Sequence, residues 1–479
     1  MRLALFGFGK HSWPSVERTR LFYERALSTR FTLLPLEGEE PLPPDVDAVL
    51  SFSSKRCWEL RPHPPVPLLF AMHGGPILDQ EFLASQLGHL ETTDAMIVNC
   101  TSDISIFREV FAGPMPRMCH LPLPVDPRVF HPQDRSECRE FLSVEGYDYV
   151  VGFVGRLVPQ KGAHQFLRMV AELKRRLHPK RVAGVMVGNY WVDYPVLAYT
   201  PDYQRYMGRL LEELGLKEDL FYFPAGLPDE DLAAVYGALD VLVHPTSSID
   251  ENFGYVPVEA MACGVPVVGS AYGGLKDTVL PGETGALMRT WTTRTGIRMD
   301  LERGVEEVVR LLQDEPLRAR MSEAALRRAR TAYSEEVCTR VLCDAVSDAI
   351  AARAQGPVRP VALAPRRPEA EVSGLLPPAN RPWEHYQGVV AHYTTSEAPP
   401  EPGPRSSLRL AAPLKEESPG RYRLDDAAWP ALFSLDAAEH RLAERCREPV
   451  KVEQLEREGL WDRDRVVHLL RWGLLLIGD

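Results

Sequence analysis

Short apolar runs alternate with amphipathic segments through roughly the first 335 residues of the chain. Such runs are typical of strands that are buried on both faces, in parallel sheets covered by helices. We expect strands at 3–7, 31–36, 47–52, 67–72, 94–99, 117–123, 149–155, 182–188, 220–226, 240–245 and 265–270. Helical segments are expected at about 15–28, 79–90 and 102–112. The alternation restarts near residue 149, so the pattern predicts an α/β fold with two doubly wound parallel-sheet domains.

The restart also sets the expected domain boundaries. We assign residues 1–130 to an N-terminal Rossmann-like domain and residues 131–354 to a second one. The polar, Pro-containing segment 126–137 is the expected connector between them. Consecutive helices are expected from about 300 to 354, where Arg and Ala become frequent.

The composition changes sharply after residue 354. Residues 355–420 contain 13 of the 42 prolines, interrupted only by the segment 383–393. That proline density is typical of a linker. Helical periodicity returns over 421–479, which predicts three short helices ending in a strand, a small winged-helix-like module.

Charge and cysteine usage narrow the class of protein. The net charge of −11 argues against binding to nucleic acid or to anionic membranes. The eight cysteines form no Cys-x-x-Cys pair and have no nearby His at metal-ligand spacing, so we expect reduced thiols and no metal site. No apolar stretch reaches the ~20 residues of a membrane helix, and the run Leu3 to Phe8 is short for a signal peptide. These features predict a cytoplasmic protein that acts on small molecules.

Two glutamates flank the expected start of a helix. Glu251 lies in the loop after the strand 240–245, and Glu259 lies on the helix that begins near Gly254. Backbone amides at a helix start suit a phosphate, and about 7 Å of helix axis separates Gly254 from Glu259. The two acids are therefore placed to bracket a bound diphosphate. The alternative is a helix N-terminal acid and a solvated glutamate, although the apolar neighbours of Glu259 disfavour the second part.

Two cations follow the strand 149–155. Arg156 comes directly after the strand, and Lys161-Gly162 opens the next helix. Cations that converge on the carboxyl end of a strand can stabilise a diphosphate leaving group. Taken alone, such a pair is more often a surface Arg and Lys. The two-glutamate segment makes the functional interpretation the stronger one.

Together these motifs resemble family 4 of the retaining glycosyltransferases. The resemblance covers residue 1 to about 350 and is strongest from 118 to 290. It is carried by Arg156-x4-Lys161-Gly162, Glu251-x7-Glu259 with Phe253-Gly254, the crossover LPLPVDPRVFHP (121–132) and AYGGLKDTVLPGETGALM (271–288).

The resemblance implies a GT-B fold, with two Rossmann-like domains across a cleft and an acceptor side formed mainly by the first. It implies transfer of a sugar from a UDP-, GDP- or ADP-linked donor to a hydroxyl acceptor, with retention, and without metal or cofactor. Arg156 and Lys161 would stabilise the departing diphosphate, Glu251 would contact the donor sugar and Glu259 the ribose. Further donor contacts are implied for Gly9, Phe223, Leu227, Asn252, Phe253, Gly254, Tyr255, Gly273 and Gly274.

The N-terminal domain carries weaker signals. Gly7-Phe8-Gly9 lacks the third glycine of a dinucleotide-binding turn, so we expect a glycine turn close to donor or acceptor. His73 ends an apolar strand before two glycines. By resemblance it is a catalytic residue that faces the reacting centre; the alternative is a structural residue of the cleft.

Several questions stay open at the level of sequence. The acceptor can be a glycan, a lipid, a small molecule or a peptide. An inactive nucleotide-sugar-binding or scaffold protein and another GT-B enzyme, such as an epimerase, are the alternatives to a transferase. Residues 421–479 carry a net charge of −2 from 10 basic and 12 acidic residues, which disfavours DNA binding. The module either packs on the transferase body or recruits a protein partner; the Pro-rich linker favours a tethered module that the chemistry does not need.

Overall fold

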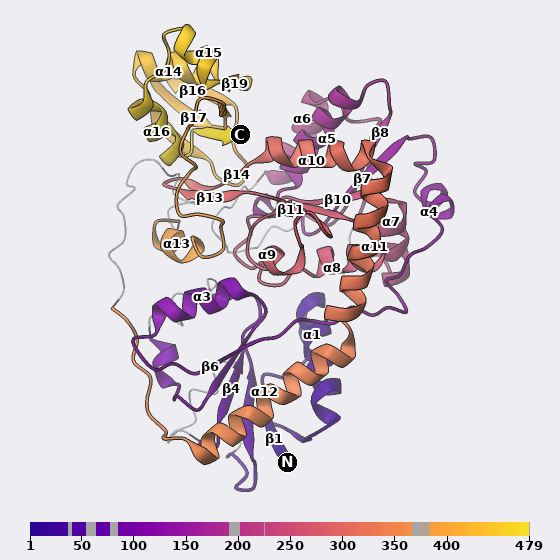
Figure 1. The fold of residues 1–479 in the computed structure, drawn as a ribbon, viewed down its shortest axis with the longest axis vertical. Coiled ribbons are helices and arrows are strands. Elements are labelled where there is room, and N and C mark those ends of the chain that lie inside the picture. The colour runs from indigo at the N-terminus through magenta and orange to yellow at the C-terminus, as the bar shows by residue number, and fades with distance from the viewer. Residues whose placement is uncertain are drawn as a thin grey trace.

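The structure is a computed structural model that describes residues 1–36, 41–53, 64–76, 85–190, 202–224, 226–365, 376 and 383–478. Two α/β domains stack along the long axis of the molecule, and a third, smaller unit lies at the end of the second domain (Figure 1). Each α/β domain is built on a six-stranded sheet whose neighbouring strands are parallel. The prediction of two doubly wound domains is therefore confirmed.

The first sheet has the strand order β2-β1-β3-β4-β5-β6. Its strands are β1 (Arg2–Phe6), β2 (Thr32–Pro35), β3 (Ala48–Phe52), β4 (Leu68–Ala71), β5 (Ala95–Val98) and β6 (Arg117–His120). Every residue of β3, β4 and β5 is buried, as continuous apolar runs predict. The helices include α1 (Pro14–Ser28) and α3 (Thr101–Val110). Pro14 is the first residue of α1, where its fixed φ suits a helix start.

The second sheet has the order β12-β11-β10-β7-β8-β9. Its strands are β7 (Tyr149–Val154), β8 (Val182–Val187), β9 (Leu220–Phe223), β10 (Val241–His244), β11 (Val267–Ser270) and β12 (Gly285–Met288). The strand order reverses between β7 and β10, which are hydrogen-bonded neighbours. In open parallel sheets a ligand binds outside the carboxyl ends of the strands at this reversal. The topology thus directs attention to the loops after β7 and β10.

Helices cover the second sheet. They include α4 (Arg135–Phe141), the short turn η4 (Pro159–Lys161), α5 (Ala163–Leu177), α6 (Tyr203–Glu213), α7 (Asp229–Ala238), α8 (Tyr255–Ala262) and α9 (Leu275–Thr278). All eleven expected strands are present, within a few residues at each end. Residues 79–84 of the expected helix 79–90 are outside the described residues. The rest of that range contains the short turn η3 (Gln86–His89). Residue 225 of the expected strand 220–226 is also outside the described residues.

Three long helices complete the two-domain body, as expected from the region 300–354. These are α10 (Leu301–Gln313), α11 (Glu315–Ala332) and α12 (Glu335–Gln355). The hydroxyl of Ser334 caps α12 by accepting from the amide of Val337. α12 packs on α1 and on the sheet of the first domain, so the chain crosses back between the domains before it (Figure 1).

The C-terminal unit, which we call the C-terminal module, spans residues 407–478. It contains β15 (Ser407–Leu410), β16 (Leu414–Ser418), β17 (Arg421–Leu424), β18 (Ala431–Ser434), α14 (Ala437–Arg445), β19 (Val450–Lys451), α15 (Val452–Arg457), α16 (Arg463–Arg471) and β20 (Leu475–Gly478). The strands form two antiparallel three-stranded sheets, β19-β15-β20 and β16-β17-β18. The three helices and the final strand match the predicted elements.

The predicted linker is where the structure differs from the sequence interpretation. β15 and β16 both lie inside 355–420, and residues 366–375 and 377–382 of that range are outside the described residues. The prolines at 402, 404, 413 and 419 flank the two strands and do not interrupt them. The prolines therefore lie in the connections around the strands. Because the two strands are short, the proline-rich connections dominated the pattern and indicated a linker.

The C-terminal module packs on the second domain, which corrects the expectation of a tethered unit. The hairpin of β13 (Thr290–Thr293) and β14 (Gly296–Met299) reaches toward the module (Figure 1). Trp291 of this hairpin is fully buried in the hydrophobic core of the module. The Arg298 guanidinium donates to the Gly473 carbonyl at 2.8 Å. A shared core and a buried cation are features of a fixed interface.

The segment before the module is also attached to the body. Helix α13 (Trp383–Val390) begins with Trp383, which is fully buried and donates from Nε1 to the Thr293 carbonyl at 3.1 Å. The ring of Trp383 packs edge-on against Trp429 of the module, with centroids 4.9 Å apart. The segment at 383–393 thus joins the hairpin of the second domain to the module.

Candidate functional site

The loop after β7 brings a lysine to the end of β10. The chain turns through Gly162, whose φ of +81° is left-handed, and a methyl group there would lie 2.1 Å from the Pro245 carbonyl oxygen. Only glycine allows this close approach. The approach places Lys161 Nζ 2.7 Å from Glu251 Oε2 and 3.2 Å from Asp250 Oδ1. The predicted cation and one of the predicted acids therefore meet.

Glu251 is 5% exposed and also faces His244, whose Nε2 lies 3.4 Å from Oε2. Burial works to raise the pKa of Glu251, but the charge of Lys161 and the contact with His244 outweigh it and hold that pKa well below the usual range. The carboxylate is therefore ionised at neutral pH. Sequence reasoning missed His244, although its place at the end of β10 was an available signal.

Arg156 pairs with Asp250, the acid next to Glu251. The guanidinium also lies over the ring of Trp13 from the first domain, 5.3 Å from the ring centroid. Two cations and two carboxylates thus form one cluster at the strand reversal. Asp250 was not predicted, because the resemblance concerns Glu251 and Glu259 and a further acid in a loop is an ordinary feature.

A glycine pair supports the backbone of the acidic loop. Gly274 N donates to the Glu251 carbonyl at 2.8 Å, and a methyl group on Gly273 would lie 2.0 Å from the same oxygen. Gly254 is the N-cap of α8, with a φ of +86°. The glycine pair therefore packs against the backbone of residues 251–253, which fixes the path of the acidic loop.

Glu259 is 4% exposed, so the interpretation as a solvated helix residue is wrong. Its Oε1 lies 2.5 Å from Nη1 of Arg18 on α1, and its Oε2 accepts from the Tyr236 hydroxyl at 2.9 Å. Arg18 also pairs with Asp229 at 3.2 Å. The carboxylate is thus held from both domains. Arg18 lies in a helix with no motif, so sequence alone gave no signal for it.

His73 follows β4 in the first domain and contacts Asn99, with 3.1 Å between Nδ1 and Oδ1. Its ring packs against Phe52, with centroids 4.3 Å apart. Burial lowers the pKa of His73 to about 3, and the hydrogen bond with Asn99 opposes that shift only in part. The imidazole is therefore neutral at physiological pH. A methyl group on the nearby Gly75 would lie 3.5 Å from Asn252 Cβ, so the loop that carries His73 touches the acidic loop.

The remaining predicted residues divide into two groups. Asn252 and Phe253 are buried in the acidic loop, and Tyr255 contacts the Thr19 hydroxyl at 2.8 Å. Gly9, Phe223 and Leu227 are not brought into the cluster by any described contact. Gly9 is exposed, and the other two pack partly buried near the end of β9, two strands away from β7.

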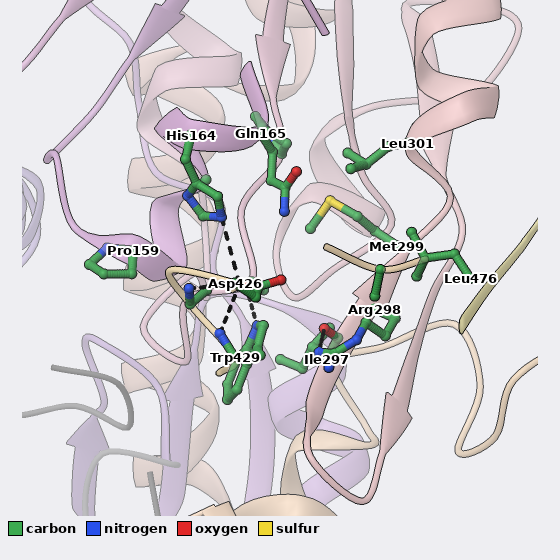
Figure 2. A pocket seen from close by; sticks show the side chains of 15 residues that line it. Pro159, His164, Gln165, Ile297, Arg298, Met299, Leu301, Asp426, Trp429 and Leu476 are labelled. Atoms are coloured by element: carbon green, nitrogen blue, oxygen red, sulfur yellow. Dashed lines mark hydrogen bonds and ion pairs between the residues drawn. The ribbon is translucent and has the colours of Figure 1, made fainter. Parts of the chain in front are cut away.

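The C-terminal module reaches the back of this cluster. Trp429 Nε1 donates to Ser247 Oγ at 3.2 Å, and Ser247 N donates to the Gln160 carbonyl at 2.7 Å. Figure 2 shows Trp429 and Asp426 beside His164 in a small cavity of about 20 Å³. Nothing in the sequence pattern predicted this contact, because it depends on how the module docks.

Two features are absent from the residues that the structure describes. No group of three or more His, Cys, Asp or Glu in the described ranges is arranged to hold a metal ion. Among the helices that the structure describes, none combines the length and the apolar character that crossing a membrane requires.

Part of the chain matches a known protein family. Residues 134–328 match the family model of glycosyl transferases group 1. We call residues 134–328 the group 1 domain, after the family model that they match. The cluster of Arg156, Lys161, Asp250 and Glu251 lies within this group 1 domain.

Proteins that are similar in sequence to this chain are named as glycosyltransferases. The chain is 33% identical over 271 residues to a D-inositol 3-phosphate glycosyltransferase of Stackebrandtia nassauensis, a match that covers 56% of this chain and 57% of that protein. It is 31% identical over 265 residues to the Corynebacterium glutamicum (strain R) protein of the same name, covering 55% and 59%. The chain thus spans less than two thirds of the length of these relatives.

Solved structures show the fold. A sucrose-phosphate synthase from Thermosynechococcus elongatus superposes with a TM-score of 0.58 at 19% identity, covering 74% of this chain and 100% of that one. The Anabaena protein HepE in complex with UDP-glucose gives 0.54 at 18% identity, covering 72% and 99%. The fold is GT-B, as the sequence predicted.

Proposed function

We propose that the protein is a retaining glycosyltransferase that moves a sugar from a nucleoside diphosphate to an acceptor hydroxyl, without a metal. The observation that carries the proposal is the buried cluster in which Lys161 and Arg156 face Glu251 and Asp250 where the strand order reverses. A group 1 domain around this cluster supports the assignment.

The chemistry follows from the charges. A departing nucleoside diphosphate develops negative charge, and preorganised cations stabilise that charge most strongly where water is excluded. Lys161 is 8% exposed, so its charge is poorly screened. The amides at the start of α8, after Gly254, add donors for phosphate oxygens. In this proposal the diphosphate takes over cations that Glu251 and Asp250 hold in the protein alone.

The acids and the histidine would then act on the sugar and the ribose. Glu251, which is ionised, would accept hydrogen bonds from donor-sugar hydroxyls. Glu259 would bind the ribose, for which the contact with Arg18 must be exchanged. The neutral His73 would face the reacting centre from the acceptor side. Gly9, Phe223 and Leu227 stay predicted donor contacts.

Donor and acceptor candidates come from the comparisons. The HepE structures contain UDP or UDP-glucose, so UDP-linked sugars are the first donors to test, before GDP- and ADP-linked ones. The relatives are named for D-inositol 3-phosphate, which makes a phosphorylated cyclitol the first acceptor to test. We also propose a cytoplasmic location, since the seven cysteines in the described residues are all unpaired.

The test is release of free nucleotide from UDP-, GDP- and ADP-glucose, with and without acceptor and EDTA. We expect one donor to be turned over, activity to survive EDTA, and NMR of the product to show the donor's anomeric configuration. A donor at 100 times its Kd should raise the free energy of unfolding by roughly 2.7 kcal/mol.

Controls separate this proposal from its rivals. Lys161→Ala should lower turnover on the order of 10²-fold or more, whereas Lys174→Ala, which removes a partly exposed cation paired with Asp219, should leave it unchanged. Binding without nucleotide release would favour an inactive binding protein. An epimerised sugar nucleotide as the product would favour another GT-B enzyme.

A further inference from the structure

A short stretch of chain, residues 391–396, is bonded to both α/β domains. It follows α13, which lies between α3 of the first domain and the β13–β14 hairpin of the second (Figure 1). On the side of the first domain, the His392 ring contacts Ser105 Oγ at 2.9 Å and Glu109 Oε2 at 2.8 Å, both on α3. On the side of the second domain, Lys276 Nζ donates to two carbonyls of the stretch, at 2.9 and 3.1 Å. We call residues 391–396 the strap.

Tyr393 lies at the centre of the strap and is fully buried. Its hydroxyl donates to Asp103 Oδ1 on α3 at 2.5 Å, and its carbonyl accepts from Gly273 N at 3.0 Å. The ring packs edge-on against Tyr272, with centroids 5.4 Å apart. One side chain therefore contacts the first domain through its hydroxyl and the second domain through its ring.

The position of Tyr393 fixes the gap between two loops of the candidate site. A methyl group on Gly75, at a φ of +78°, would lie 2.4 Å from the Tyr393 hydroxyl and 3.5 Å from Asn252 Cβ. On the other face, a methyl group on Gly273 would lie 3.1 Å from Cδ2 of the Tyr393 ring. The loop that carries His73 and the glycine pair thus both lie against Tyr393, and the loop that carries Glu251 lies against Gly75.

The hydroxyl of Tyr393 supports a carboxyl group in an unfavourable place. Asp103 is fully buried, and burial raises its pKa to about 7, while hydrogen bonds from Tyr393 and Cys100 oppose the shift. Removing one of these donors leaves a buried carboxyl group with fewer hydrogen bonds, which lowers the stability of the folded protein. The contact between Tyr393 and Asp103 is therefore sensitive to the loss of a single oxygen atom.

We propose that Tyr393 is a positioning residue of the transfer site. It sets the separation between the loop of residues 73–75 and the loop of residues 249–254, and so aligns the acceptor side with the donor side. The inference rests on the proposed function, because that function uses both loops. It makes residues outside the group 1 domain part of the transferase machinery.

The experiment compares Tyr393→Phe with Tyr422→Phe in the full-length protein. Both changes remove one hydroxyl from a buried ring, but Tyr422 lies in β17 of the C-terminal module, stacked on His440. We expect Tyr393→Phe to lower kcat of transfer about tenfold or more, with donor KM within about threefold of wild type. Hydrogen exchange followed by mass spectrometry should become faster in peptides that cover 72–76 and 271–276. Tyr422→Phe should change neither measurement.

Asp103→Asn provides a second test if Tyr393→Phe folds poorly. It keeps the size of the side chain, removes the charged acceptor and should give the same separation of kcat from KM. Wild-type kcat and wild-type exchange in both variants would overturn the proposal, and so would a rise in donor KM alone. If the wild-type protein turns over no nucleotide sugar, the proposed function fails, while the exchange measurement still decides whether Tyr393 orders the two loops.

Discussion

The group 1 domain and the chain that follows it differ in how they build their contacts. In the group 1 domain, Arg156, Lys161 and Glu251 come directly from loops at the carboxyl ends of parallel strands, so their convergence follows from the topology. In the following chain, Tyr393 and Trp429 reach the same region through docking. The comparison shows that a site can be completed by residues that carry no motif. Five predictions test how far the two regions depend on each other.

Truncation after residue 354 should have the largest effect. It removes the partners of Trp291 and Ile297, which are almost fully buried beside the C-terminal module and α13. Truncating one buried Trp to Ala typically costs about 3–5 kcal/mol of stability. The cost of exposing this whole interface should therefore exceed the free energy of unfolding of the second domain. Size-exclusion chromatography and thermal unfolding should show aggregated or unfolded protein.

Trp429→Ala is the graded form of that experiment. It should cost about 3–5 kcal/mol, whereas Trp461→Ala, at a half-buried Trp of the module, should cost less. A truncated protein that unfolds cooperatively and binds nucleotide as well as the full chain does would restore the tethered-module interpretation.

Protonation of His164 at acidic pH should weaken the interface between the second domain and the C-terminal module. Burial lowers the pKa of His164 to about 4, and the charge of Asp426, with 3.8 Å between Nε2 and Oδ1, opposes the shift only in part. A depressed pKa in the folded state means that the stabilising contribution is present above about pH 6.5 and is lost as the pH falls toward 4. The loss should reach about 3 kcal/mol. Denaturant unfolding of His164→Gln should show a flatter pH dependence in this window, and the exposed His468→Gln should match wild type.

Lys161→Ala and Arg156→Ala should each lower turnover on the order of 10²-fold or more, about 2.7 kcal/mol, even at saturating donor. Loss of Lys161 also leaves Glu251 buried and charged without its partner, so this variant should be less stable. Adding Glu251→Gln should restore stability without restoring turnover. Recovery of activity at high donor concentration would show a binding role instead.

His73→Ala should have the smallest effect on the protein as a whole. Nucleotide affinity should stay within a few fold, because no described contact joins His73 to the cluster around Glu251. Transfer should fall about tenfold, as for a group that acts in the transition state. Since the pKa of His73 is about 3, its titration should not appear in the rate between pH 5 and 8. An unfolded variant would identify His73 as a structural residue.

The sequence predicted the elements whose signal is local. Continuous apolar runs gave all eleven expected strands, and β12 was missed because Gly285–Met288 begins on a glycine and holds no β-branched residue. Lys161 and Glu251 were predicted because a strand precedes each loop. Arg18 and Tyr393 were not, since each acts through a partner more than 200 residues away.

The placement of the connections has a consequence for motion. The chain passes between the α/β domains after β6 and again between α11 and α12, both away from α13 in the view of Figure 1. Two bodies joined along one edge retain a rotational degree of freedom about that edge. The strap fastens the other edge through Lys276 and His392. Wide rotation therefore requires those bonds to break first, so the lifetime of the strap sets an upper limit on how often the domains separate.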